Sequence, residues 1–108
     1  MADLTQHEWR RQMEHDDHAV ILDVRTSREL EIGIIPGAIH LDIYQAGKFM
    51  ADIQALDREK SYYVYCKVGV RSGQACNIMQ QLGFRYTYNL IGGMDNWNGE
   101  VTSYNNQI

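Results

Sequence analysis

Four short apolar segments along the chain predict β-strands. Residues 19–25, AVILDVR, form a continuous β-branched and aliphatic run of the kind that a parallel sheet buries on both faces. Residues 61–66, SYYVYC, predict a second strand, and residues 84–90, FRYTYNL, alternate in character. A shorter strand is expected around residues 38–41, after a Pro-Gly turn.

Helical patterns alternate with these strands. The first helix is expected to run to about Met13, because Thr5 and Glu8 have the spacing of a capping box. Further helical segments are expected in TSRELEIG (residues 26–33), in QAGKFMADIQAL (residues 45–56), from Ser72 until Gly83, and around Trp97.

The alternation of strands and helices predicts an α/β fold. We expect right-handed crossovers, a mostly parallel central sheet of four to five strands, and helices on both faces. The 108 residues have the size of one domain, so residues 1–108 are interpreted as a single domain. Ligands of such sheets bind beyond the carboxyl ends of the strands, and both Cys66 and the segment 23–25 are expected there.

Composition and charge narrow the classes of partner. The net charge is −4, which makes nucleic acid an unfavourable partner and restricts any anion site to local groups. No apolar run reaches the roughly 20 residues that span a bilayer, and the N-terminus lacks the pattern of a secretory leader. Two cysteines, ten residues apart, make no disulfide framework. We therefore expect a cytoplasmic protein with free thiols, and neither a nucleic-acid nor a membrane partner.

The loop that follows the strand 61–66 carries the strongest chemical signal. A strand-to-helix loop directs backbone N–H groups at one point, and the helix dipole adds positive potential there. Cys66 at this point is expected to ionise more readily than a free thiol. Gly69 allows a tight turn, and Lys67 and Arg71 add positive charge. The pattern indicates a nucleophile for anionic substrates, whereas the alternative is a buried, inert cysteine.

Five segments give the chain its resemblance to a known family. They are ILDVRTSREL, GIIPGAIHLD, YYVYCKVGVRS, QLGF and LIGGMDNW, and they span about residues 20–97. In this order they resemble the single-domain rhodaneses, the thiosulfate:cyanide sulfurtransferases. The chain departs from the family at Ile34, where a histidine is frequent, and Lys67, Val68 and Val70 occupy positions that vary among relatives.

The resemblance implies a three-layer rhodanese-like fold and a persulfide mechanism. Cys66 would attack the outer sulfur of thiosulfate and carry that sulfur to cyanide or a thiol, including a thiol on a protein. The backbone amides of residues 67–71 would hold the persulfide anion, Arg71 would order the loop, and Lys67 would attract thiosulfate. No metal or other cofactor is expected.

A supporting group is also implied by the family's DVR motif. Asp23 and Arg25 would form a pair near the loop, with Glu29 as a possible partner of Arg25. These three residues are expected to fix geometry and not to transfer protons.

Two alternatives to a thiosulfate enzyme stay open. One is a sulfur-relay module that passes persulfide sulfur between proteins. The other is a phosphatase or arsenate reductase, whose related loops have seven residues, whereas Cys66 to Arg71 spans six. Cys76 is expected to pack as a small apolar residue. The HDDH at residues 15–18 is expected to be a solvated turn, because four successive side chains rarely converge on one metal ion.

Overall fold

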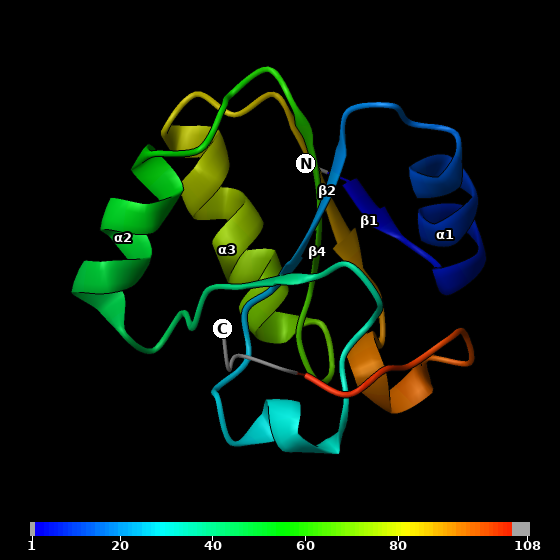
Figure 1. The fold of residues 1–108 in the computed structure, drawn as a ribbon. Coiled ribbons are helices and arrows are strands. Elements are labelled where there is room, and N and C mark those ends of the chain that lie inside the picture. The colour runs from blue at the N-terminus through cyan, green and yellow to red at the C-terminus, as the bar shows by residue number, and fades with distance from the viewer. Residues whose placement is uncertain (1, 105–108) are drawn as a thin grey trace.

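A five-stranded sheet lies between helices in the computed structural model, which describes residues 2–104 (Figure 1). The strands are β1 (Ala2–Leu4), β2 (Ala19–Asp23), β3 (Ile39–His40), β4 (Ser61–Tyr65) and β5 (Tyr86–Leu90). The α-helices are α1 (Gln6–Glu14), α2 (Ala46–Gln54) and α3 (Val70–Gln81), and two short 3₁₀ helices are η1 (Glu29–Ile32) and η2 (Gly93–Asn96).

The sheet has the order β1-β5-β4-β2-β3, and all its neighbouring strands are parallel. The predicted α/β fold with a mostly parallel sheet is thereby confirmed. The edge strand β1 was not predicted from the sequence, because a strand of three residues is too short to show a repeating pattern.

Helices cover both faces of the sheet. In Figure 1, α1 lies on one side, and α2 and α3 lie on the other. All residues of the central strand β4 are buried. Because side chains alternate along a strand, Tyr62 and Val64 pack towards α2 and α3, together with Cys66 just beyond the strand. Tyr63 and Tyr65 point to the opposite side and pack in the cluster beside α1.

The expected helix boundaries hold with small shifts. The capping box of α1 is present, since Glu8 N–H donates to Thr5 Oγ1 at 3.3 Å and Thr5 N–H donates to Glu8 Oε1 at 3.0 Å. The helix α3 begins at Val70, two residues before the expected start, because Gly69 reverses the chain immediately before it. Trp97 follows η2 and is not inside it.

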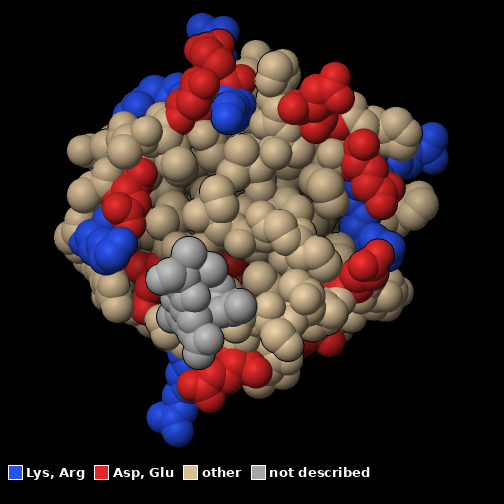
Figure 2. All heavy atoms as spheres, in the orientation of Figure 1, with Lys and Arg blue, Asp and Glu red and all other residues tan. Residues whose placement is uncertain are grey.

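The face shown in Figure 2 carries acidic and basic side chains interspersed around its edge, with a broad uncharged middle. This view shows no large patch of one sign. Within residues 2–104, no helix combines the length and the apolar character needed to cross a membrane.

Candidate functional site

The sulfur of Cys66 lies where β4 ends and the loop to α3 begins. Its Sγ accepts hydrogen bonds from the backbone N–H of Gly69 at 3.1 Å and of Ser72 at 3.4 Å. The Ser72 hydroxyl lies 3.3 Å from the same sulfur. The cysteine is fully buried, so these contacts and the amino end of α3 dominate its surroundings.

The loop takes this shape because residue 69 is glycine. Gly69 has a φ of 102°, a conformation that residues with a Cβ rarely adopt. A Cβ there would also lie 3.2 Å from the Leu90 carbonyl oxygen and 3.3 Å from the Gly92 nitrogen. The predicted role of Gly69 in the turn is confirmed, and a close approach of the β5–η2 turn adds a second reason for it.

The surroundings of Cys66 favour its ionised form. Burial raises the pKa of the Cys66 thiol, but hydrogen bonds from the Ser72 side chain and from the amides of Ser72, Gly69 and Val68 lower it. The net effect is a pKa below the ordinary value of a cysteine. Hydrogen bonds to a thiolate favour the charged form, which is the nucleophilic one.

Arg71 is held by a carboxylate and is not a free cation at the rim. Its two terminal nitrogens donate to the two carboxylate oxygens of Glu29 at 2.6 and 2.8 Å. Thr26 also donates to Glu29, from its backbone N–H at 3.0 Å and from its hydroxyl at 3.1 Å. The hydrogen bonds from Arg71 lower the pKa of Glu29 to about 2. The pair joins α3 to η1 and fixes one side of the loop.

Asp23 and Arg25 form the expected pair. Arg25 Nη2 donates to Asp23 Oδ2 at 2.7 Å, and both side chains are buried. The guanidinium also donates to the carbonyl oxygens of Glu29 at 3.3 Å and Gly33 at 2.8 Å. Glu29, the possible partner of Arg25, contacts it only through its backbone carbonyl, because the Glu29 carboxylate binds Arg71.

Lys67 also differs from the expectation. Its ammonium group lies 2.9 Å from an oxygen of Asp95, so a negative charge offsets the positive charge that was expected to attract thiosulfate. The neighbouring loop side chains, Val68 and Val70, are 51% and 63% exposed. The rim of the loop is therefore formed by paired charges and exposed apolar side chains.

A groove of about 360 Å³, which we call the side groove, lies beside the loop. It is lined by Arg25, Glu29, Ile32, Lys67, Met94, Asp95 and Val101. Four of these residues belong to the ion pairs described above, and Ile32 is 88% exposed. The side groove thus offers an apolar surface between neutralised charges.

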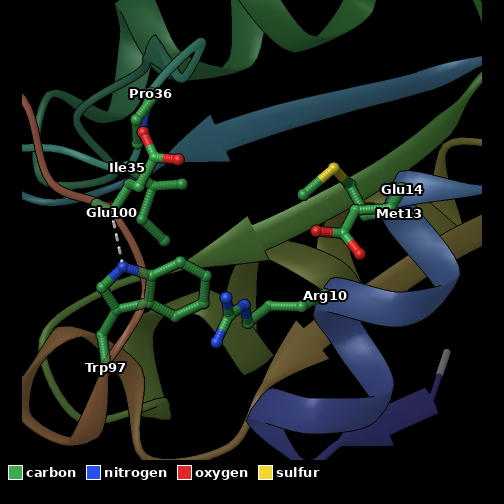
Figure 3. Close-up of a pocket in the computed structure, with 7 residues that line it drawn as sticks. All are labelled: Arg10, Met13, Glu14, Ile35, Pro36, Trp97 and Glu100. Atoms are coloured by element: carbon green, nitrogen blue, oxygen red, sulfur yellow. Dashed lines mark hydrogen bonds between the residues drawn. The ribbon is translucent and has the colours of Figure 1, made fainter.

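A separate cavity of about 170 Å³ lies between α1 and the segment after η2 (Figure 3). The Arg10 guanidinium lies 5.2 Å from the centre of the Trp97 ring there, and the Trp97 indole donates to the Glu100 carbonyl oxygen at 2.9 Å. None of its lining residues belongs to the loop 66–71. This cavity is therefore distinct from the cysteine site.

Ser72 and Asn89 contact this site, although neither was predicted as a site residue. Ser72 supplies a backbone N–H and a hydroxyl next to the sulfur, and its hydroxyl donates to Asn89. The sequence does contain a signal for Ser72, because a serine in the first helical turn after a nucleophile loop lies close to the nucleophile. No local signal identifies Asn89, because β5 reaches the loop only through the strand order.

The remaining candidates have structural roles. Cys76 is buried in the core with a free thiol, and burial raises its pKa to about 12. Asp16 of the HDDH segment accepts hydrogen bonds from the His18 N–H and from the Tyr63 hydroxyl. Among residues 2–104, no group of three or more His, Cys, Asp or Glu side chains is placed to hold a metal ion.

Several known proteins resemble this chain in both amino-acid sequence and fold. The sequence model of the rhodanese-like domain family matches residues 5–100 of this chain. The putative sulfurtransferase YtwF of Bacillus subtilis is 34% identical over 93 residues, which cover 86% of each chain. The putative sulfur carrier protein YrkF of the same bacterium is 30% identical over 86% of this chain and 49% of its own length.

Two further matches concern a thiosulfate enzyme and a solved structure. The thiosulfate sulfurtransferase GlpE of Coxiella burnetii is 33% identical over 72% of this chain and 70% of its own length. The crystal structure of a rhodanese-like domain protein from Staphylococcus aureus superposes with a TM-score of 0.82 and 25% identity, covering 97% of this chain and all of that one. With a family model that matches residues 5–100, a relative 34% identical over 86% of both chains and a cysteine loop at the expected strand end, the chain belongs to the rhodanese-like family.

Proposed function

We propose that this protein is a sulfurtransferase that carries sulfane sulfur as a persulfide on Cys66. The observation that carries the proposal is the set of backbone donors around the sulfur, from Gly69 at 3.1 Å and Ser72 at 3.4 Å. Preformed donors of this kind stabilise a negative charge with little reorganisation. The sulfurtransferase names of similar proteins support the same class of reaction.

Thiosulfate is the donor that we propose first. The Cys66 thiolate attacks the outer sulfur, an S–S bond forms to Cys66, and the S–S bond of thiosulfate breaks with its electron pair leaving on sulfite. Cyanide or a thiolate then attacks the terminal sulfur of the persulfide, and the Cys66 thiolate is regenerated. The loop amides stabilise the anionic sulfur in both steps.

Mass spectrometry after incubation with thiosulfate tests this proposal. We expect the peptide containing Cys66 to gain the mass of one sulfur atom, and cyanide to remove that mass while thiocyanate forms. Cys66→Ser should show neither result, whereas Cys76→Ala, which alters only the buried core thiol, should show both. The absence of added sulfur on wild-type Cys66 with every donor tried would contradict the proposal.

A second candidate, a sulfur relay between proteins, is favoured by the composition of the rim. The cations next to the loop are offset by carboxylates, and Val68, Val70 and Ile32 expose apolar surface. Such a rim attracts a small dianion weakly, but it suits the apolar part of a larger partner.

Saturation kinetics separate the two candidates. Saturation at low thiosulfate concentration, with a rate that falls as salt is added, would support the thiosulfate enzyme. Weak saturation combined with rapid transfer of persulfide sulfur to a protein thiol would support the relay. The cytoplasmic location stays a prediction from the sequence.

A further inference from the structure

A chain of hydrogen bonds runs behind Cys66 to the N-terminal strand. The Ser72 hydroxyl lies 3.3 Å from Cys66 Sγ and donates to Asn89 Oδ1 at 2.5 Å. The Asn89 side-chain amide donates to Asp3 Oδ1 at 2.9 Å and to the Gly69 carbonyl oxygen at 3.1 Å. Cys66 and Ser72 are fully buried and Asn89 is 5% exposed, so water offers these groups few alternative partners.

The orientation of the Asn89 amide is fixed by its two acceptors. A side-chain amide has two N–H donors on nitrogen and only acceptor capacity on oxygen. Both donors of Asn89 are directed at oxygens, one on Asp3 and one on Gly69. Turning the amide over would place its oxygen against these two oxygens, so Oδ1 must face Ser72.

The Ser72 hydroxyl has one proton and two neighbours that compete for it. While Cys66 is a thiol, its S–H donates to Ser72 Oγ, and Ser72 donates to Asn89. When Cys66 ionises, its S–H bond breaks and the proton passes to water or buffer. The Ser72 O–H then either stays on Asn89, with an oxygen lone pair facing the anionic sulfur, or rotates to the sulfur and leaves Asn89 Oδ1 without a donor.

The geometry points to Asn89 and Asp3 as positioning residues that compete with the Cys66 thiolate for the Ser72 hydroxyl proton and so keep the proportion of thiolate below what an uncontested Ser72 hydroxyl would give. The consequence for sulfur transfer rests on the proposed function, in which the thiolate is the attacking species. Strand pairing places Asp3 directly opposite Asn89. Asp3 precedes residues 5–100, which the family model matches, so the family match does not imply this contact.

The other charged groups around Cys66 are unchanged in the variants that test this idea. They are Arg71 with Glu29, Lys67 with Asp95, and Arg25 with Asp23. Only Asp3 contributes a charge that a test variant removes.

The test measures the rate at which iodoacetamide alkylates Cys66 as a function of pH, read on the peptide that contains it. Asn89→Ala removes the competing acceptor, so the midpoint of the profile should fall by about one pH unit, the size of one hydrogen bond to a thiolate. The double variant that combines Ser72→Ala with Asn89→Ala should have the same midpoint as Ser72→Ala alone, because the competed proton is absent from both. An unchanged midpoint in Asn89→Ala, or an equal shift in both backgrounds, would overturn the inference.

Two variants at the exposed Asp3 separate orientation from charge and keep the test open if Asn89→Ala does not fold. Asp3→Ala frees the Asn89 amide and should lower the midpoint by less than Asn89→Ala does. Asp3→Asn retains an acceptor oxygen and should stay closer to wild type. Equal shifts in the two variants would show an effect of charge alone and remove Asp3 from the positioning role. Thermal unfolding of each variant confirms that the profile belongs to a folded protein.

Alkylation requires no sulfur donor, so this inference and the proposed function fail separately. Shifted midpoints without any persulfide on Cys66 would support the hydrogen-bond chain and contradict the sulfurtransferase. Persulfide formation with unshifted midpoints would support the sulfurtransferase and contradict the hydrogen-bond chain.

Discussion

The residues nearest to the sulfur of Cys66 stabilise it through hydrogen bonds more than through free charge. Backbone N–H groups of Gly69 and Ser72 point at Sγ. The guanidinium of Arg71, in contrast, binds the Glu29 carboxylate through both of its terminal nitrogens. A bidentate pair of this kind fixes direction as well as charge. Arg71 therefore acts chiefly on the shape of the loop.

Glu29→Gln should make the protein less sensitive to acid while weakening it at neutral pH. The pKa of Glu29 is about 2 in the folded protein against an ordinary 4.5. A depressed pKa gives stability that is complete above about pH 4.5 and is lost as the pH falls towards 2. Since the pair is partly exposed, we expect a loss of about 1 kcal/mol at pH 7.

Urea unfolding at pH 7 and at several values between 4.5 and 2 measures this change. The variant should lose less stability than wild type across that interval. Glu59→Gln removes an exposed carboxylate and controls for net charge. If Glu29→Gln and wild type lose stability in parallel below pH 4.5, the ion pair does not contribute as described.

At the scale of elements, the short helix η2 supports the cysteine loop. The N–H of Met94 donates to the Cys66 carbonyl oxygen at 2.9 Å, and the N–H of Asp95 donates to the Lys67 carbonyl oxygen at 3.0 Å. Gly93 lies between these segments with a φ of 57°. A Cβ on Gly93 would lie 2.5 Å from both carbonyl oxygens, so the two segments approach as closely as they do only because this residue is glycine.

Gly93→Ala should therefore displace the cysteine loop. We expect the free energy of unfolding to fall by at least about 2 kcal/mol, from backbone strain together with steric overlap. The alkylation rate of Cys66 at neutral pH should fall with it, because the amides move away from the sulfur. Both quantities are measured on the same preparation, by urea unfolding and by peptide mass spectrometry.

Gly47→Ala is the matched control for this prediction. Gly47 lies in α2 with an ordinary φ, and a Cβ there meets no atom within 4 Å. Alanine should raise the stability by up to about 1 kcal/mol through helix propensity and leave alkylation unchanged. Similar behaviour of the two variants would contradict the proposed support of the loop by η2.

At the scale of the whole molecule, one tryptophan organises the side of the sheet covered by α1. Trp9 is fully buried, and its indole N–H donates to the Tyr88 carbonyl oxygen at 3.2 Å. Its ring makes edge-to-face contacts with Tyr63, Tyr65 and Trp97. Helix α1, the centre of the sheet and the C-terminal segment thus meet at a single side chain.

Trp9→Ala should lower the free energy of unfolding by about 3–5 kcal/mol, because it leaves a large cavity in a packed core. Ile32→Ala removes apolar atoms that are already exposed to solvent and should change stability by less than about 0.5 kcal/mol. Urea unfolding of both variants measures the difference. A loss below about 1 kcal/mol for Trp9→Ala would contradict its role in joining these three parts.

The sequence by itself determined the strands β2 and β4, whose carboxyl ends lie one or two residues before the predicted ones, together with the capped first helix, the parallel α/β fold and the strand-end position of Cys66. These features depend on local patterns and on residue types that act through their neighbours in the chain. Loop length and Gly69 likewise act locally, so the shape of the loop was also predictable.

Only the tertiary structure decided which groups complete the site. Glu29 pairs with Arg71 and not with Arg25, Lys67 is offset by Asp95, and Asn89 reaches Ser72 from another strand. The three-residue strand β1, which carries Asp3, finds its place through pairing with β5. Each of these contacts joins residues far apart in the chain, so it follows from strand order and packing and not from local pattern.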